Sequence, residues 1–156
     1  MIPMAELLRT HAAPGEVTWI GLRPKRLADL RPVGRAELLV SGLEGDHARP
    51  GKRAVTRIQA EHLPVIASLA HRDAISPQDL RRNIMVSGIN LTALHNHPIR
   101  IGGAVIRMTT PCAPCLRMEK ALVTGAYNAM RGHGGWCAEV VEPGPIQLGD
   151  RVEQIA

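Results

Sequence analysis

The stretch Ile99-Arg100-Ile101-Gly102-Gly103-Ala104-Val105-Ile106-Arg107-Met108 predicts a β-hairpin more clearly than any other part of this chain. Two short runs rich in apolar residues flank the Gly102-Gly103 pair. Both glycines accept the positive φ that a tight, primed hairpin turn requires. We therefore expect two antiparallel strands joined by a two-residue turn.

Further short elements are expected on both sides of this hairpin. Glycine (15 residues) and proline (12 residues) are spread throughout and divide the chain into many short segments. We expect strands over 17–22, 36–40, 54–58, 84–87, 136–141 and 151–155. We expect helices over 60–70, 76–81, 114–122 and 126–130. Many short strands with few helices predict a mainly β (α+β) fold, a closed or nearly closed β-barrel with a few helical insertions.

The length of 156 residues suits one domain, so we expect residues 1–156 to fold as a single unit. No run of about 18 apolar residues occurs, so no membrane span is expected. The first residues lack the order of charges and apolar residues that marks a secretory signal. Three cysteines, an odd number, favour reduced thiols over structural disulfides. These features predict a cytoplasmic protein.

The net charge of +5 points to an anionic partner. Nucleic-acid surfaces that bind by stacking need several aromatic side chains, and this chain has only Trp19, Tyr127 and Trp136. We therefore expect no nucleic-acid partner, and a small anionic ligand fits better. A merely solvated basic surface is the alternative. The basic residues of the first third of the chain are Arg23, Lys25, Arg26, Arg31, Arg35, Arg49, Lys52 and Arg53.

Cys115 is the first candidate for chemistry. Pro114 suits the first position of a helix, and the residues after Cys115 are good helix formers. The positive end of the helix dipole and Arg117 should favour the thiolate, which is both the nucleophile and the metal ligand.

Three other interpretations of the cysteines stay open. Cys112 and Cys115 have the Cys-x-x-Cys spacing of a redox dithiol, although no α/β sheet is expected around them. They are also typical of small, half-buried residues at a helix start. With His133 and Cys137 they formally make a Cys3His zinc set.

Three junctions between expected elements combine arginine, histidine, glycine and amide groups. Forked guanidinium donors match phosphate or carboxylate oxygens, and the backbone N–H groups of a glycine-rich loop can cradle an anion. Each junction alone is also typical of a solvated surface, so a site is indicated only if they meet at one mouth of the barrel. The residues are Asp46 and His47 in the turn 42–47; Arg81, Arg82 and Asn83; and Asn128, Arg131, His133 and Gly134.

With these residues in view, the chain resembles a MOSC domain, the molybdenum-cofactor sulfurase C-terminal module, in its stand-alone bacterial form. The resemblance spans roughly residues 17–152. It depends on the following motifs: Gly42-x-x-Gly45-Asp46-His47, Arg81-Arg82-Asn83-Ile84, Ile89-Asn90-Leu91, Ile101-Gly102, Pro111-Cys112-x-Pro114-Cys115, Gly134-Gly135-Trp136 and Gly149-Asp150.

The resemblance implies a MOSC-type β-barrel that binds the molybdenum cofactor and reduces N-hydroxylated compounds. Cys115 would ligate molybdenum or carry sulfur as a persulfide. Arg81, Arg82 and Asn83 would lie beside the pterin or its phosphate. His47, Asn128, Arg131 and Gly134 would also contact the cofactor. His133 or Asp46 would handle protons.

The same resemblance sets out the partners and the alternatives. No flavin, iron–sulfur or aminotransferase-like module is fused in this sequence, so reduction would need a separate electron-donor protein. A persulfide sulfur carrier for metal–sulfur cluster or cofactor assembly, loaded by a desulfurase, is one alternative. A zinc-stabilised, non-enzymatic binding module is the other.

Overall fold

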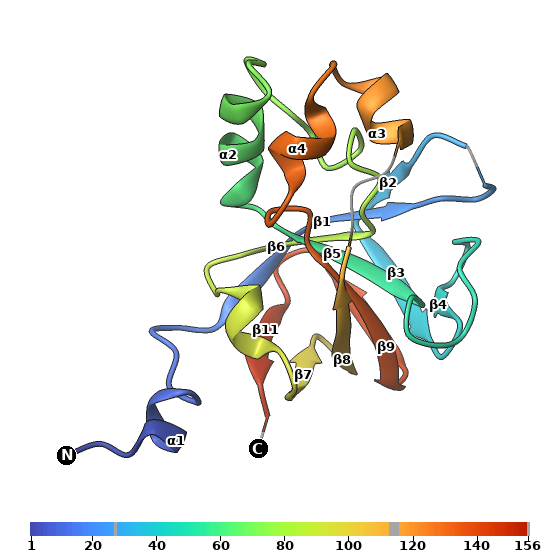
Figure 1. The fold of residues 1–156 in the computed structure, drawn as a ribbon. Helices are drawn as coiled ribbons and strands as arrows, with labels where there is room; N and C mark the ends of the chain where they lie inside the picture. Colours follow the sequence, from blue (N-terminus) through green and yellow to red (C-terminus); the bar gives the residue numbers. More distant parts are fainter. Residues whose placement is uncertain (27, 113–115, 156) are drawn as a thin grey trace.

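The fold is a closed seven-stranded β-barrel, seen in a computed structural model that describes residues 1–26, 28–112 and 116–155 (Figure 1). Neighbouring strands pair in an antiparallel manner, except that β5 and β6 are parallel. Pairing of the last strand with the first closes the barrel. In order around the barrel the strands are β1 (Gly15–Leu22), β6 (Ile84–Ser87), β5 (Val55–Gln59), β9 (Trp136–Glu142), β8 (Ala104–Pro111), β7 (Pro98–Ile101) and β11 (Arg151–Gln154).

Four further strands lie outside the closed ring. Strand β2 (Arg31–Val33) pairs with β1. A separate three-stranded sheet has the order β10 (Gly144–Gln147), β3 (Arg35–Leu39) and β4 (Gly42–Leu43). The six expected strands outside the hairpin are therefore confirmed, with ends shifted by up to two residues, whereas β2, β4 and β10 were not predicted.

The predicted hairpin is confirmed, but its two glycines do different things. Ile101 is opposite Ala104 across the two-residue turn. Only Gly102 has a positive φ, of 55°. Gly103 instead lets β10 approach, because a Cβ there would lie 2.8 Å from Cδ of Pro145, and its backbone N–H donates to the Pro145 carbonyl at 2.8 Å. The expectation of two positive φ angles was wrong, and close packing explains the second glycine.

Three helices gather at one end of the barrel, and α1 (Met4–Leu7) lies apart from them (Figure 1). These helices are α2 (His62–Leu69), α3 (Leu116–Ala121) and α4 (Ala126–Met130). A 3₁₀ turn, η1 (Leu91–Leu94), links β6 to β7. No helix in the described part of the chain is long and apolar enough to cross a membrane.

Two apolar clusters hold these layers together. The larger one fills the barrel with aliphatic side chains such as Ile20, Ile84 and Ile106. The smaller one lies under the helices, where Leu63 and Ile66 of α2 pack with Ile58 of β5. Strand β5 therefore separates two cores, and all five of its residues are buried.

The helix expected over 76–81 is a turn, so that prediction was wrong. Ser76 and Asp79 cap each other through N–H bonds to side-chain oxygens, at 2.9 and 3.3 Å. The backbone N–H groups of Asp79 and Arg81 donate to carbonyls three residues earlier, as in a turn. Arg81 then has a positive φ of 55°, which ends the turn. The capping signal was real, but the chain leaves the helical conformation at once to enter β6.

Candidate functional site

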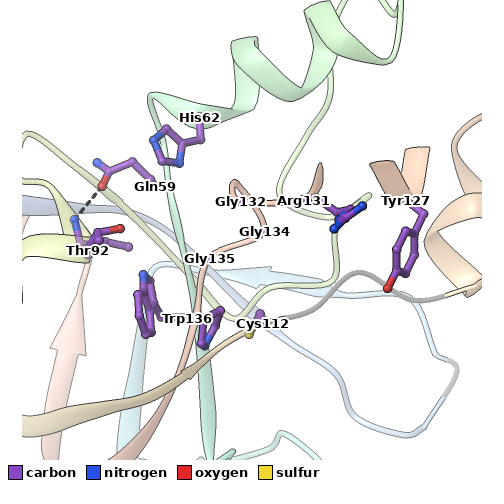
Figure 2. A pocket seen from close by; sticks show the side chains of 12 residues that line it. Gln59, His62, Thr92, Cys112, Tyr127, Arg131, Gly132, Gly134, Gly135 and Trp136 are labelled. Carbon is purple, nitrogen blue, oxygen red and sulfur yellow. Dashed lines mark hydrogen bonds between the residues drawn. The ribbon is translucent and has the colours of Figure 1, made fainter. Parts of the chain in front are cut away.

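A pocket of about 430 Å³ opens where the helices meet the end of the barrel (Figure 2). Cys112 follows β8, and Trp136 begins β9. Figure 2 shows His62, Gln59 and Thr92 on one side of the pocket, and Arg131 and Tyr127 on the other. The complete lining is Gln59, His62, Leu91, Thr92, Pro111, Cys112, Tyr127, Arg131, Gly132, Gly134, Gly135 and Trp136.

The loop 131–135 forms one wall because its glycines let it lie against neighbouring backbone. Gly135 has a φ of 88°, and a Cβ there would lie 1.9 Å from the Arg57 carbonyl oxygen. A Cβ on Gly134 would lie 2.6 Å from the carbonyl oxygen of Cys112. The N–H of Cys112 donates to the Gly135 carbonyl at 2.8 Å. The loop is thus fixed to both β5 and the end of β8.

Arg82 supports this loop from behind. Its Nε donates to the Gly134 carbonyl at 2.7 Å, and its Nη1 donates to the Leu80 carbonyl at 3.1 Å. Its Nη2 is buried and has no hydrogen-bond partner among the described residues. Buried guanidinium N–H groups are normally satisfied, so this atom is an exception, and it belongs to a residue that lies behind the pocket wall and does not line the pocket.

Two thiols meet beside the pocket. The Sγ atoms of Cys112 and Cys137 lie 2.9 Å apart, and both side chains are buried. The hydrogen bond from Cys112, aided by the charges of Arg53 and Arg82, lowers the pKa of Cys137 to about 6 although burial opposes it. The same hydrogen bond, together with burial, raises the pKa of Cys112. The two shifts are opposite because one hydrogen bond joins the thiols, so Cys137 is the member of the pair that loses its proton more readily.

Two histidines lie edge to face above the pocket. The ring centroids of His62 and His133 are 5.3 Å apart at 77°. Burial, and then the neighbouring His133, lower the pKa of His62 below its usual 6.5. The Nδ1 atom of His133 is buried and has no partner in the described part of the chain. His62 is thus a neutral base at pH 7 that lines the pocket.

Comparison with known proteins places this geometry in a family. The family model for the MOSC domain matches residues 27–153. The chain belongs to the MOSC domain family. No curated protein matches it.

Solved structures share the MOSC fold of this chain. The YuaD protein from Bacillus subtilis has a TM-score of 0.80 at 17% identity, over 90% of this chain and 94% of that one. YiiM from Escherichia coli has a TM-score of 0.72 at 21% identity, over 90% of this chain and 70% of that one. YiiM from Geobacillus stearothermophilus has a TM-score of 0.76 at 16% identity, over 92% of this chain and 76% of that one. At these identities the likeness shows the fold alone.

Within this MOSC fold, Asp46, His47 and Asn83 do not line the pocket. The Asp46 carboxylate accepts from the backbone N–H of Arg23 at 2.6 Å and from its Nη2 at 3.0 Å. Asn83 is fully buried and donates to Asp46 at 3.1 Å. His47 Nδ1 lies 3.1 Å from the Arg23 carbonyl. Their cofactor and proton-handling roles stay predictions. In the structure Asp46 and His47 bond to Arg23 directly after β1, and Asn83 bonds to Gly21 of β1 and Thr56 of β5.

The remaining candidates divide between the pocket and its surroundings. Arg131 lines the pocket, and exposed Asn128 beside it accepts from Arg131 Nη1 at 3.4 Å. Arg81 donates to the Ala28 carbonyl at 2.5 Å. Cys115, the expected metal ligand, lies outside the described residues. Of the residues singled out in the sequence, the fold therefore places Arg82, Arg131, His133 and Gly134 in or next to the pocket wall.

The Cys3His zinc set cannot be assembled from what the structure describes. Cys112 and Cys137 do come together, but no group of three or more His, Cys, Asp or Glu side chains gathers among residues 1–26, 28–112 and 116–155. The fourth member, Cys115, lies outside those ranges.

Sequence reasoning missed several pocket residues. His62 looks like an ordinary residue near a helix start, and Gln59 like the end of a strand. Gln59 Oε1 accepts from the Leu91 N–H at 2.9 Å and its Nε2 donates to Glu61 at 2.6 Å, so its amide orders η1 and shapes the pocket. Both are polar residues that follow the apolar strand expected over 54–58, and this position at a strand end is the signal that could have identified them.

Proposed function

We propose that this MOSC protein holds the molybdenum cofactor in the pocket and reduces N-hydroxylated compounds there. The observation that carries the proposal is the pocket itself, at the barrel end where the 131–135 loop meets Cys112. Its volume of about 430 Å³ lies in the range of small-ligand sites, roughly 300–1,000 Å³. Family membership supports the cofactor class.

The described side chains fit such a cofactor chemically. Tyr127 and Trp136 line the pocket with aromatic rings, which suit a flat heterocycle, and the Trp136 ring is held by His95 with the centroids 4.8 Å apart. Arg131 lines the pocket and is exposed, so it places a positive charge within reach of an anionic ligand, while Arg82 holds the Gly134 carbonyl of the pocket wall in place. Arginine forks suit phosphate oxygens, and the basic net charge attracts an anion.

In this proposal the Cys115 thiolate would hold a molybdenum centre, and the chemistry that this centre would supply is the two-electron reduction of an N–O bond. Electrons come from a separate donor protein. The chain itself orients the ligand through Arg131 and excludes water with Trp136. Cleavage of an N–O bond consumes protons, and His62, whose pKa is lowered by burial and by the neighbouring His133, would relay protons from solvent rather than store them.

Metal analysis tests the proposal. Protein made in a cofactor-competent host should contain molybdenum, and protein made in a cofactor-deficient host should not. Cys115→Ala should lower the molybdenum content to that of the deficient host, because the soft thiolate ligand is gone. Arg131→Met should weaken retention about tenfold by removing a charged hydrogen bond. Arg100→Met, an exposed arginine on β7 outside the pocket, is the matched control and should retain molybdenum.

Equal and negligible molybdenum in all preparations would refute the proposal. In that case mass spectrometry after incubation with a cysteine desulfurase tests the sulfur carrier. One added sulfur that is lost in Cys115→Ala would identify the chain as a persulfide carrier instead.

A further inference from the structure

We propose that Cys112 and Cys137 form a reversible disulfide beside the pocket, with hydrogen peroxide as the oxidant. This modification site is separate from the proposed cofactor ligand Cys115. It holds whether or not the molybdenum cofactor binds.

The backbone already places the two sulfur atoms for this bond. Their separation of 2.9 Å exceeds the covalent S–S length of about 2.05 Å by less than 1 Å. Pro111 is opposite Trp136 in the β8–β9 ladder, and Cys112 is bonded to Gly135 through its N–H. Both cysteines therefore lie on paired segments, and joining them requires no change of register.

An oxidant can reach the pair through the pocket. Cys112 lines the pocket although its side chain is only 7% exposed. Cys137 is 4% exposed, and its Sγ lies 2.9 Å from that of Cys112, so a small oxidant that reaches Cys112 is also next to the Cys137 sulfur. Small reagents such as hydrogen peroxide fit this path, whereas a protein thiol would not reach the sulfur atoms.

The surroundings favour a thiolate in this pair. Arg53 and Arg82 act electrostatically on both thiols, and Arg82 Nη2 has no competing acceptor among the described residues. The hydrogen bond from Cys112 stabilises the negative charge on Cys137. One sulfur is thus poised to attack, and the other is in contact to complete the bond.

The reaction with peroxide balances without any further reagent. One thiolate attacks a peroxide oxygen, the O–O bond breaks, and hydroxide leaves and takes a proton to form water. The sulfenic acid formed is attacked by the second thiol, so that the S–S bond forms, the S–O bond breaks and a second water leaves. Two thiols and one hydrogen peroxide give one disulfide and two waters. The two electrons pass from sulfur to peroxide.

Peptide mapping distinguishes this disulfide from one between Cys112 and Cys115. Trypsin places Cys112 and Cys115 together in residues 108–117, and Cys137 in residues 132–151. After oxidation and blocking of free thiols, we expect the two peptides to be cross-linked and Cys115 to be alkylated. Dithiothreitol should reverse the cross-link. Cys115→Ser should keep the cross-link, and Cys137→Ser should lose it.

Two outcomes would overturn the proposal. One is an oxidised 108–117 peptide with its internal disulfide and Cys137 alkylated. The other is full alkylation of Cys112 and Cys137 after treatment with oxidant. If Cys137→Ser fails to fold, the wild-type protein and Cys115→Ser decide the question alone.

The pH dependence of disulfide formation gives a second readout. Because the pKa of Cys137 is about 6, its thiolate is nearly fully formed at pH 7 and the fraction hardly rises above that pH. The oxidation rate in stopped-flow assays should then change less than about twofold between pH 7 and 9. A rise of about 20-fold over that interval is what an ordinary thiol would give, and it would contradict the arrangement described.

Discussion

Replacing Arg57 by methionine is expected to stabilise the protein, raising its free energy of unfolding by about 1–3 kcal/mol. Arg57 belongs to β5, and its side chain is fully buried. None of its Nε, Nη1 and Nη2 atoms has a hydrogen-bond partner among the described residues, and it forms no salt bridge there. Burial lowers its pKa to about 10 although the charge of the nearby Cys112 opposes this, so the guanidinium still carries its charge at pH 7.

Methionine is unbranched and apolar like the inner part of the arginine side chain, it is shorter by the outer guanidinium atoms, and it removes the buried charge. Denaturant unfolding of the wild type and Arg57→Met measures the difference. Arg107→Met, an exposed arginine on the neighbouring part of the barrel, is the control and should change stability by less than about 0.5 kcal/mol. A loss of stability in Arg57→Met would mean that the guanidinium is satisfied in solution by a partner outside the described contacts.

Local sequence signals predicted most of the barrel. The Gly102-Gly103 turn and the short apolar runs identified the hairpin and six more strands, because each strand carries its own pattern of apolar residues. Strand β10 was missed because Pro143 and Pro145 are typical of a turn. It forms because it pairs with β3, where Ile146 is opposite Ala36, and that long-range pairing leaves no local signal.

The site was only partly predictable for a related reason. The residue types of Arg82 and of the 131–135 loop indicated that both could bind an anion. The sequence did not show that they are in contact, which the structure shows through the hydrogen bond from Arg82 to the Gly134 carbonyl. The contact between Cys112 and Cys137 depends on the register of β8 against β9, which spacing alone does not fix. Asn83 was grouped with Arg82 because they are adjacent in sequence. In the loop before β6 their side chains instead have different partners, and Asn83 contacts Asp46.

The Asn83 side chain links three strands, so Asn83→Ala should cost about 3–4 kcal/mol of stability. Its Oδ1 accepts from the N–H and Oγ1 of Thr56 in β5, at 3.1 and 3.2 Å, and from Arg23 at 3.1 Å. Its Nδ2 donates to the Gly21 carbonyl in β1 and to Asp46, both at 3.1 Å. Alanine would leave these buried donors and acceptors without their shared partner.

Thermal and denaturant unfolding of Asn83→Ala should show this loss, and two variants identify its cause. Asn83→Asp keeps the size but replaces the N–H donor with an oxygen that faces the Gly21 carbonyl and the Asp46 carboxylate, so it should be at least as destabilising. Asn128→Ala removes an exposed amide with one 3.4 Å hydrogen bond and should change stability by less than about 0.5 kcal/mol. If Asn83→Ala were as stable as Asn128→Ala, the amide would not be holding β1, β5 and β6 together.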